Sequence, residues 1–118
     1  MNSKKLGQTG EDIACGYLET QGYDILERNY RSKIGEIDIV AQDSDNLVFI
    51  EVKTKSNDDF GLPQEMVNYR KQQKLIKVAY SYLKDKNLDD ISWRIDVVAI
   101  NKNGDITEIN LIKNAVEA

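Results

Sequence analysis

The hydrophobic positions of this chain follow helical spacing in two segments and strand spacing in five. Between residues 9 and 21 the apolar positions recur at i, i+3 and i+4, which predicts a helix with Thr9 as its N-cap and Gly22 at its end. A second helix is predicted from Gln64 to Lys84, after a loop that ends in Pro63. Segments rich in Val, Ile and aromatic residues predict strands at 23–30, 34–41, 47–55, 91–100 and 106–112.

The order of these elements, α-β-β-β-α-β-β, predicts an α/β fold in which helices pack against a mixed sheet. The 118 residues contain no repeats or low-complexity linkers, so we expect a single domain over residues 1–118. No apolar run approaches the roughly 20 residues of a membrane span, and the N-terminus does not resemble a signal peptide. We therefore expect a cytoplasmic protein without a membrane partner, in which the single cysteine, Cys15, is reduced and buried.

The two strands on either side of the turn at residues 42–46 carry charges among their apolar residues. Side chains alternate between the faces of a strand, so Glu36 and Asp38 share one face, and Glu51, Lys53 and Lys55 share another. If the register brings these faces together, two carboxylates and an ammonium group converge beside the buried centre of the strands. Burying such charges is costly unless they are paired or bind a metal. The Asp…Glu-x-Lys pattern is therefore typical of what a magnesium-dependent nuclease needs.

The absence of histidine and the net charge exclude several classes of catalytic and binding site. There is no histidine, which excludes histidine-ligated zinc, Ser-His-Asp and Cys-His catalysis, and nucleases with a histidine base. A metal ion must then be held by carboxylates and carbonyls, which suit Mg²⁺ or Mn²⁺. The net charge of −4 argues against a protein that coats nucleic acid, although the acids of a metal site contribute to that sum.

For phosphodiester cleavage the sequence offers two metal ligands, Asp38 and Glu51, with the carbonyl of Val52 as a further donor. We expect Lys53 to act in its protonated form at the scissile phosphate, since the ordinary pKa of lysine is about 10.4. Glu11 lies at the border of the apolar stripe of the first helix. It either completes the acidic pocket or is a favourable acid in the first helical turn.

Other interpretations of the acidic residues stay open at this stage. Glu36 is interpreted as the salt-bridge partner of a neighbouring lysine or arginine. Asp96 is expected to pair with Arg94 or Arg28 and to be structural. The alternative for the strand cluster as a whole is a buried ion-pair network that binds no metal.

Several motifs, in order along the chain, resemble the YraN-like family of bacterial proteins, a largely uncharacterised group of predicted endonucleases. That family is similar to archaeal Holliday-junction resolvases within the PD-(D/E)xK superfamily. The motifs that carry the resemblance cover nearly the whole chain: Gly10-Glu11, Arg28–Arg31, Gly35–Ala41, Phe49–Thr54 and Arg94–Val98. The resemblance implies a restriction-endonuclease-like fold, metal binding by Asp38, Glu51 and Glu11, a catalytic Lys53 and, from the resolvases, a homodimer.

Substrate-binding residues are suggested partly by the same resemblance. Some members of the superfamily place a Gln of the following helix near the substrate, which assigns Gln72 to that role. Clustered basic residues predict a positively charged rim, although a solvated helix face is the commoner meaning of such a run. The rim residues are Arg31, Lys33, Lys55, Lys71 and Lys74.

The sequence thus predicts a metal-dependent nuclease that acts on DNA, on branched or otherwise structured substrates, because nothing in it resembles a base-reading motif. The alternative is a non-catalytic module of the same fold that binds nucleic acid or protein.

Overall fold

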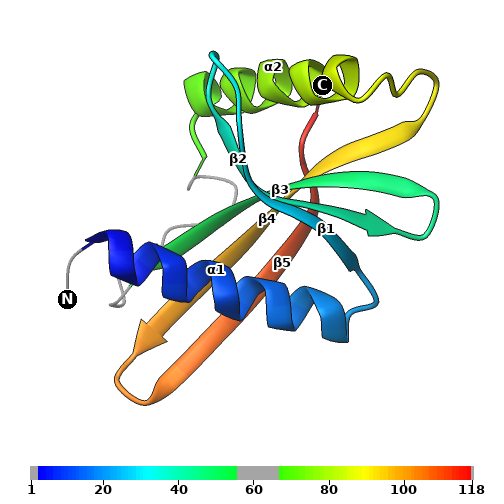
Figure 1. Ribbon diagram of the computed structural model, residues 1–118. Coiled ribbons are helices and arrows are strands. Elements are labelled where there is room, and N and C mark those ends of the chain that lie inside the picture. Colours follow the sequence, from blue (N-terminus) through cyan, green and yellow to red (C-terminus); the bar gives the residue numbers. More distant parts are fainter. Residues whose placement is uncertain (1–2, 56–66, 118) are drawn as a thin grey trace.

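The computed structural model describes residues 3–55 and 67–117, which form two helices and one five-stranded sheet (Figure 1). The elements are α1 (Ser3–Thr20), β1 (Asp24–Arg31), β2 (Glu36–Asp43), β3 (Asn46–Lys55), α2 (Tyr69–Asp85), β4 (Ser92–Asn103) and β5 (Ile106–Val116). This order confirms the predicted α-β-β-β-α-β-β sequence of elements and is consistent with a restriction-endonuclease-like fold. Neither of the two helices in these ranges is long and apolar enough to cross a membrane.

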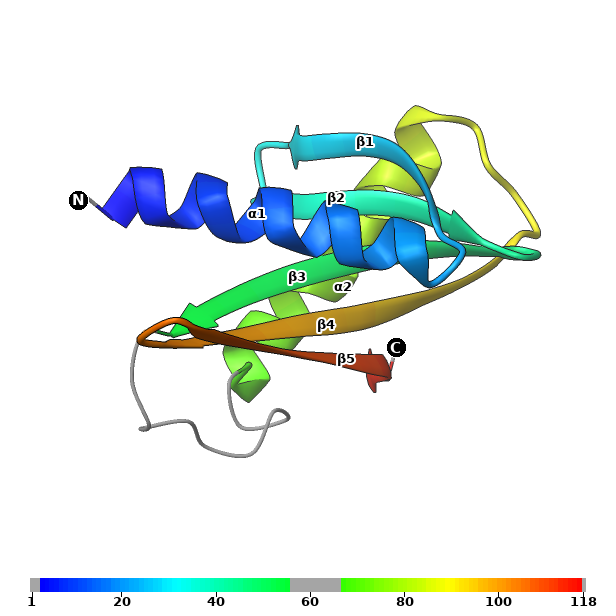
Figure 2. The same cartoon turned by 90° about the horizontal axis from the view of Figure 1, so that it is seen from below.

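The sheet is mixed, and its strands lie in the order β1-β2-β3-β4-β5. The β3–β4 pair is parallel, and the other neighbours are antiparallel. A parallel pair requires a long crossover, and the crossover between β3 and β4 contains α2. Figure 2 shows that α1 and α2 cover opposite faces of the sheet.

Two hydrophobic clusters hold the helices on the sheet, because successive strand residues point to opposite faces. In β3, Val48 and Ile50 belong to the cluster that contains Leu18 of α1. Phe49, between them, belongs to the cluster that contains Val78 of α2. Burying each of these side chains stabilises the fold by about 1.5–3 kcal/mol relative to exposure. The alternation therefore fixes which face each charged residue further along β3 will occupy.

Gly22 ends α1 as predicted, with a φ of +91°. Its N–H donates to the Glu19 carbonyl at 3.1 Å, and the N–H of Tyr23 donates to the Leu18 carbonyl at 3.0 Å. The predicted start is wrong, because α1 begins at Ser3 and Thr9 lies inside the helix. The apolar stripe marks only the turns that contact the sheet, so the polar turns before it give no periodic signal.

The predicted start of the second helix is also wrong, since α2 begins at Tyr69. Asn68 is its N-cap, and the Asn68 side chain accepts a hydrogen bond from the Lys71 N–H at 2.9 Å. Val67 precedes the cap and is not helical. The loop predicted at 57–63 and residues 64–66 lie outside the described residues.

The strand boundaries differ from the prediction where turns form. β2 begins at Glu36 rather than at Ile34, because the Ser32 N–H donates to the Gly35 carbonyl at 2.8 Å and closes a turn. Ile34 is left on this turn with 45% of its surface exposed. β4 and β5 both extend past their predicted ends, and the residues of the turn between them are Gly104 and Asp105, one position later than predicted.

Asp96, which is fully buried in β4, is the centre of an ion-pair network. Its carboxylate accepts hydrogen bonds from Arg94 Nε at 2.9 Å, from the Tyr23 hydroxyl at 2.8 Å and from the Asn114 N–H at 2.8 Å. Arg94 also contacts Asp43 at 2.6 Å. The register of β4 and β5 shifts between Ile95 and Val97, and this bulge leaves the Asn114 N–H available to the carboxylate. The predicted pairing of Asp96 with Arg94 is confirmed.

Candidate metal and nucleic-acid site

Asp38 of β2 and Glu51 of β3 meet where the pairing of these two strands ends. The paired positions run from Asp43↔Asn46 to Ile39↔Ile50, and the next residue on each strand is one of the two acids. Asp38 Oδ2 accepts a hydrogen bond from the Val52 N–H at 2.8 Å. The Asp38 side chain thus accepts the hydrogen bond of a β3 main-chain N–H just beyond the last paired residues of β2 and β3. This bond fixes the Asp38 carboxylate beside Glu51.

Glu51 is only 6% exposed, an unusual environment for a carboxylate. Burial, and then the charge and hydrogen bond of the neighbouring Asp38, raise the pKa of Glu51 to about 8. The ammonium groups of Lys71 and Lys53 act in the opposite direction and lower that pKa. Two carboxylates and two ammonium groups therefore interact here, and Glu51 is the buried member of the four.

The structure brings together the three residues of the Asp…Glu-x-Lys pattern. Lys53 follows Glu51 on the same face of β3 and is half-buried. Lys71 reaches the cluster from α2, with its Nζ 3.4 Å from Glu51 Oε2. The sequence predicted Lys71 only as a phosphate contact. Its ion pair with Glu51 was missed because the residue pattern of a strand does not show which turn of a helix packs against that strand.

Glu11 faces the same cluster from α1 but forms an ion pair with a different residue, Arg28. It is 9% exposed, and its pKa is raised by burial first and by the charge of Asp38 second. Arg28 lowers that pKa, with its Nε 3.4 Å from Glu11 Oε1, and also contacts Asp12 at 2.7 Å. The role of Arg28 as the partner of Glu11 was not found from the sequence, because β1 and α1 meet only in the fold.

A glycine sets the position of Glu11 above β3. A Cβ at Gly10 would collide with the Oγ1 of Thr54, so α1 lies directly against the end of β3 at this point. Glycine leaves room for the Thr54 side chain at this close approach of helix and strand. The predicted pair Gly10-Glu11 therefore combines a packing residue with an acid that faces the carboxylate pair.

The remaining predicted residues are spread more widely. Gln72 donates its Nε2 to the Val67 carbonyl at 2.8 Å, so its amide braces the start of α2. Arg31 pairs with Glu36 at 3.3 Å, which confirms the salt-bridge interpretation of Glu36. Lys74 packs its stem near Gly35, where an added Cβ would lie 3.0 Å from Lys74 Cε. Lys33 and Lys55 are exposed.

The acidic residues of the cluster fit a metal ion only in part. Within residues 3–55 and 67–117, no three acids, cysteines or histidines are grouped closely enough to hold a metal ion by themselves. The predicted set of three carboxylates is therefore not assembled, because Glu11 is turned toward Arg28. The adjacent pair of Asp38 and Glu51 does fit a hard divalent cation, since carboxylate oxygens are the donors such an ion prefers and the two groups repel each other as anions.

Comparison with known proteins places these residues in a wider group. The model of a family described as "Uncharacterised protein family UPF0102" matches residues 10–100. A UPF0102 protein of Syntrophus aciditrophicus (strain SB) is 47% identical over 113 residues, which cover 96% of this chain and 89% of the relative. Another from Desulforamulus reducens is 50% identical over 117 residues, covering 96% of each chain. One from Caldanaerobacter subterraneus subsp. tengcongensis is 42% identical over 118 residues, covering 98% and 97%.

Proposed function

We propose that this chain, which belongs to the UPF0102 family of uncharacterised proteins, is a divalent-metal-dependent nuclease that hydrolyses phosphodiester bonds in DNA. The family assignment confirms the sequence resemblance to YraN-like proteins. The relatives carry names that describe no activity, so the nuclease proposal rests on the chemistry of the chain itself.

One observation carries the proposal: Asp38 and Glu51 are adjacent at the end of the β2–β3 ladder, and Glu51 is nearly buried. Bringing two carboxylates together in poorly hydrated surroundings destabilises a fold unless a cation offsets their repulsion. The strongly raised pKa of Glu51 reflects this cost. An arrangement that is unfavourable for the empty protein supports a role in binding a divalent cation.

Each residue of the cluster has a role in the proposed reaction. Asp38 and Glu51 would hold Mg²⁺ or Mn²⁺, with the Val52 carbonyl as a further oxygen donor. Such an ion, when bound, would neutralise charge on the phosphate oxygens and lower the pKa of the water that attacks the phosphorus atom. Lys53, in its protonated form, would stabilise the charge that develops on the scissile phosphate. Lys71 would be released from Glu51 to meet the incoming strand.

The second candidate function is a non-catalytic module that binds nucleic acid or protein. The observation in its favour is the ion pair between Lys71 and Glu51, which offers Glu51 a counter-ion from within the chain. Because that pair leaves Asp38 and Glu51 side by side, it offsets only part of their repulsion. We therefore prefer the nuclease.

Cleavage assays separate the two functions. Single-stranded, duplex, flap and four-way-junction DNA and the matching RNAs are incubated with Mg²⁺ or Mn²⁺, with a chelator as the blank. The nuclease proposal expects cleavage of at least one substrate by the wild type and none by Asp38→Asn, which keeps the size of the side chain but not its charge. Asp105→Asn, an exposed acid in the β4–β5 turn, is the matched control and should cleave normally. A wild type that cuts nothing and gives no Mn²⁺ heat in calorimetry would support the module.

A further inference from the structure

The solvent-facing side of α2 is basic in a chain whose net charge is −4. The helix contains five basic residues and one acid, Asp85. Asp85 accepts a hydrogen bond from the Tyr30 hydroxyl at 2.6 Å, so it is turned toward β1. α2 thus carries a net positive charge, and it is the helix whose Lys71 contacts Glu51.

Two tyrosines interrupt this basic face and are unusually exposed. Tyr69 is 74% exposed and Tyr80 is 56% exposed. They are separated by three turns of α2, so they lie within about 20° of each other around the helix and about 16 Å apart along it. Exposed aromatic rings gain nothing from the core, which on this helix is built by Leu75, Val78 and Ala79 among others.

Two hollows run along α2 between these tyrosines. The first, of about 460 Å³, is lined by Tyr69 and Ile34, and the second, of about 380 Å³, is lined by Tyr80 and Ile34. Lys77 lines both. The hollows share Ile34 and Lys77 and are therefore adjacent, and we call the two together the α2 trough. Its other charged lining residues are Arg70, Lys74 and Lys84.

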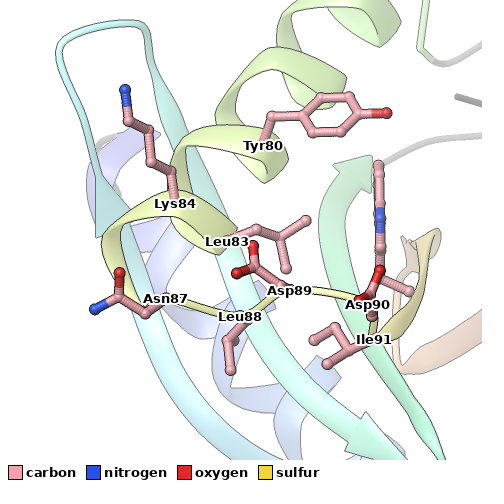
Figure 3. Close-up of a pocket in the computed structure, with 9 residues that line it drawn as sticks. Tyr80, Leu83, Lys84, Asn87, Leu88, Asp89, Asp90 and Ile91 are labelled. Atoms are coloured by element: carbon pink, nitrogen blue, oxygen red, sulfur yellow. The ribbon is translucent and has the colours of Figure 1, made fainter.

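Tyr80 is held in a defined orientation at the far end of the trough. Its ring meets the ring of Trp93 edge to face, with centroids 5.3 Å apart and an interplanar angle of 78°. Figure 3 shows Tyr80 projecting from α2 above Leu83, while Lys84 extends away from Asp89 and Asp90. An aromatic ring that is held by one neighbour and still 56% exposed is suited to receive a flat partner.

A basic groove with interspersed aromatic rings is the usual architecture for binding single-stranded nucleic acid, because the cations follow the phosphates and the rings stack on bases. A duplex does not fit as well, since its base faces are already stacked. A membrane surface does not fit either, because an interfacial helix needs its apolar face for lipid and that of α2 is packed on the sheet.

We propose that the α2 trough binds unpaired nucleotides, with Tyr69 and Tyr80 stacking on bases and Arg70, Lys74, Lys77 and Lys84 contacting phosphates. This binding site does not depend on catalysis. Combined with the proposed function, it identifies the substrate class as nucleic acid with a single-stranded segment beside the scissile bond, since Lys71 joins α2 to the carboxylate pair at 3.4 Å.

The test measures binding of a labelled oligothymidylate by fluorescence anisotropy in the presence of EDTA, where no metal-dependent cleavage occurs. Tyr69→Ala should weaken binding about 5- to 100-fold, the loss expected for one base stack. Tyr69→Phe, which keeps the ring, should bind like the wild type. The control is Ile106→Ala, which removes another exposed apolar side chain (62%) from the start of β5 and should change nothing.

Two further probes distinguish stacking on bases from electrostatic attraction to negative charge alone. An abasic strand of the same length offers phosphates without rings, so Tyr69→Ala should bind it as well as the wild type does. Vesicles containing phosphatidylserine should bind more weakly than the oligothymidylate and without dependence on Tyr69. The proposal is overturned if Tyr69→Ala leaves oligothymidylate affinity unchanged, if it weakens abasic binding equally, or if the vesicles bind more tightly.

Trp93 provides an independent readout at the other end of the trough, because it is the single tryptophan of the chain. Stacking of a base on Tyr80 should change Trp93 fluorescence in the wild type and in Tyr80→Phe. A Trp93 signal that does not respond to saturating oligothymidylate contradicts the role of Tyr80.

These outcomes are distinguishable from the fate of the nuclease proposal. If the wild type cleaves DNA but Tyr69→Ala binds oligothymidylate as tightly as the wild type, the trough proposal is wrong and the nuclease proposal stands. If oligothymidylate binds in a Tyr69-dependent way but no substrate is cut, the trough stands and the nuclease fails.

Discussion

The ammonium group of Lys71 on α2 lies 3.4 Å from Oε2 of Glu51 on β3. The Glu51 side chain is 8% exposed, whereas that of Lys71 is 36% exposed. Glu51 therefore has a counter-ion that can move into solvent without opening the core. This contact also ties the crossover helix to the strand that carries the Glu-x-Lys pattern.

A double-mutant cycle should reveal the energetic coupling of this pair. At pH 9, above the pKa of Glu51, Lys71→Met leaves the ionised carboxylate with one fewer cation, so in a chelating buffer it should lower the free energy of unfolding by about 1 kcal/mol, a modest value because Lys71 is partly hydrated. In Lys71→Met/Glu51→Gln this loss should disappear, since no buried anion remains. Urea denaturation measures all four proteins, and strictly additive effects would contradict the coupling.

Glu51→Gln should change how stability depends on pH. The pKa of Glu51 is about 8 in the folded chain and 4.5 in the ordinary reference state, so between these values the folded state holds more protons than the unfolded state. The free energy of unfolding of the wild type therefore falls as the pH rises through this window. Glu51→Gln lacks that titration and should become more stable relative to the wild type with rising pH.

Urea titrations in EDTA near both ends of the window measure this difference. Glu36→Gln, which removes an exposed acid from β2, is the control and should show no comparable trend. Adding Mn²⁺ at the upper end should restabilise the wild type, by about 2.7 kcal/mol at a hundred times the dissociation constant, and should affect Glu51→Gln far less. Equal Mn²⁺ effects in both proteins would argue against Glu51 as a ligand.

Most of the fold could be predicted because two periodicities and a few turn residues determine it. The alternation of β3 placed Phe49 and Val48 on different faces, and Gly22 marked the end of α1. The starts of both helices were missed for a physical reason. The first turns of α1 show no apolar stripe. For α2, the loop ending in Pro63 suggested a start at Gln64, whereas the N-cap is Asn68.

The candidate site was predictable where its residues lie close together in sequence. Asp38, Glu51 and Lys53 belong to one hairpin, so strand alternation was enough to bring them together. The partners that come from elsewhere in the chain were not predictable in the same way. Arg28 reaches Glu11 and Lys71 reaches Glu51 through packing of helix on sheet, which a single sequence does not reveal.

The Asp96 network should govern stability rather than activity. Asp96→Ala leaves Arg94 partly buried without its main partner, and we expect a loss of about 3–5 kcal/mol in the free energy of unfolding. Tyr23→Phe removes one hydrogen bond to the same carboxylate and should cost about 1–2 kcal/mol. Urea denaturation gives both values. Cleavage per folded molecule should match the wild type in Tyr23→Phe, and a selective loss of activity there would contradict a structural role.

The basic face of α2 should determine how binding responds to salt. Each phosphate contact on a single strand adds roughly 0.7 to the slope of log affinity against log salt. Replacing Lys74 and Lys77 together by Ala should therefore weaken oligothymidylate binding and reduce that slope by about 1.4. Lys102→Ala, on β4, is the control and should leave both quantities unchanged. If the double variant keeps the wild-type slope, these lysines are solvated and do not contact the strand.

Gly10 should be a sensitive position of α1, although it carries no chemistry. In Gly10→Ala the new Cβ collides with Thr54 Oγ1, so either Thr54 changes rotamer or the helix shifts and carries Glu11 away from Asp38. We expect a lower melting temperature and, if the chain is a nuclease, reduced cleavage. Gly16→Ala is the matched control on the same helix, because a Cβ there has nothing within 4 Å and should stabilise α1 by about 1 kcal/mol.

Thr54→Ala removes the obstructing oxygen, so adding it to Gly10→Ala should restore stability and cleavage together. Recovery of stability without recovery of cleavage would mean that Thr54 has a role of its own at the site.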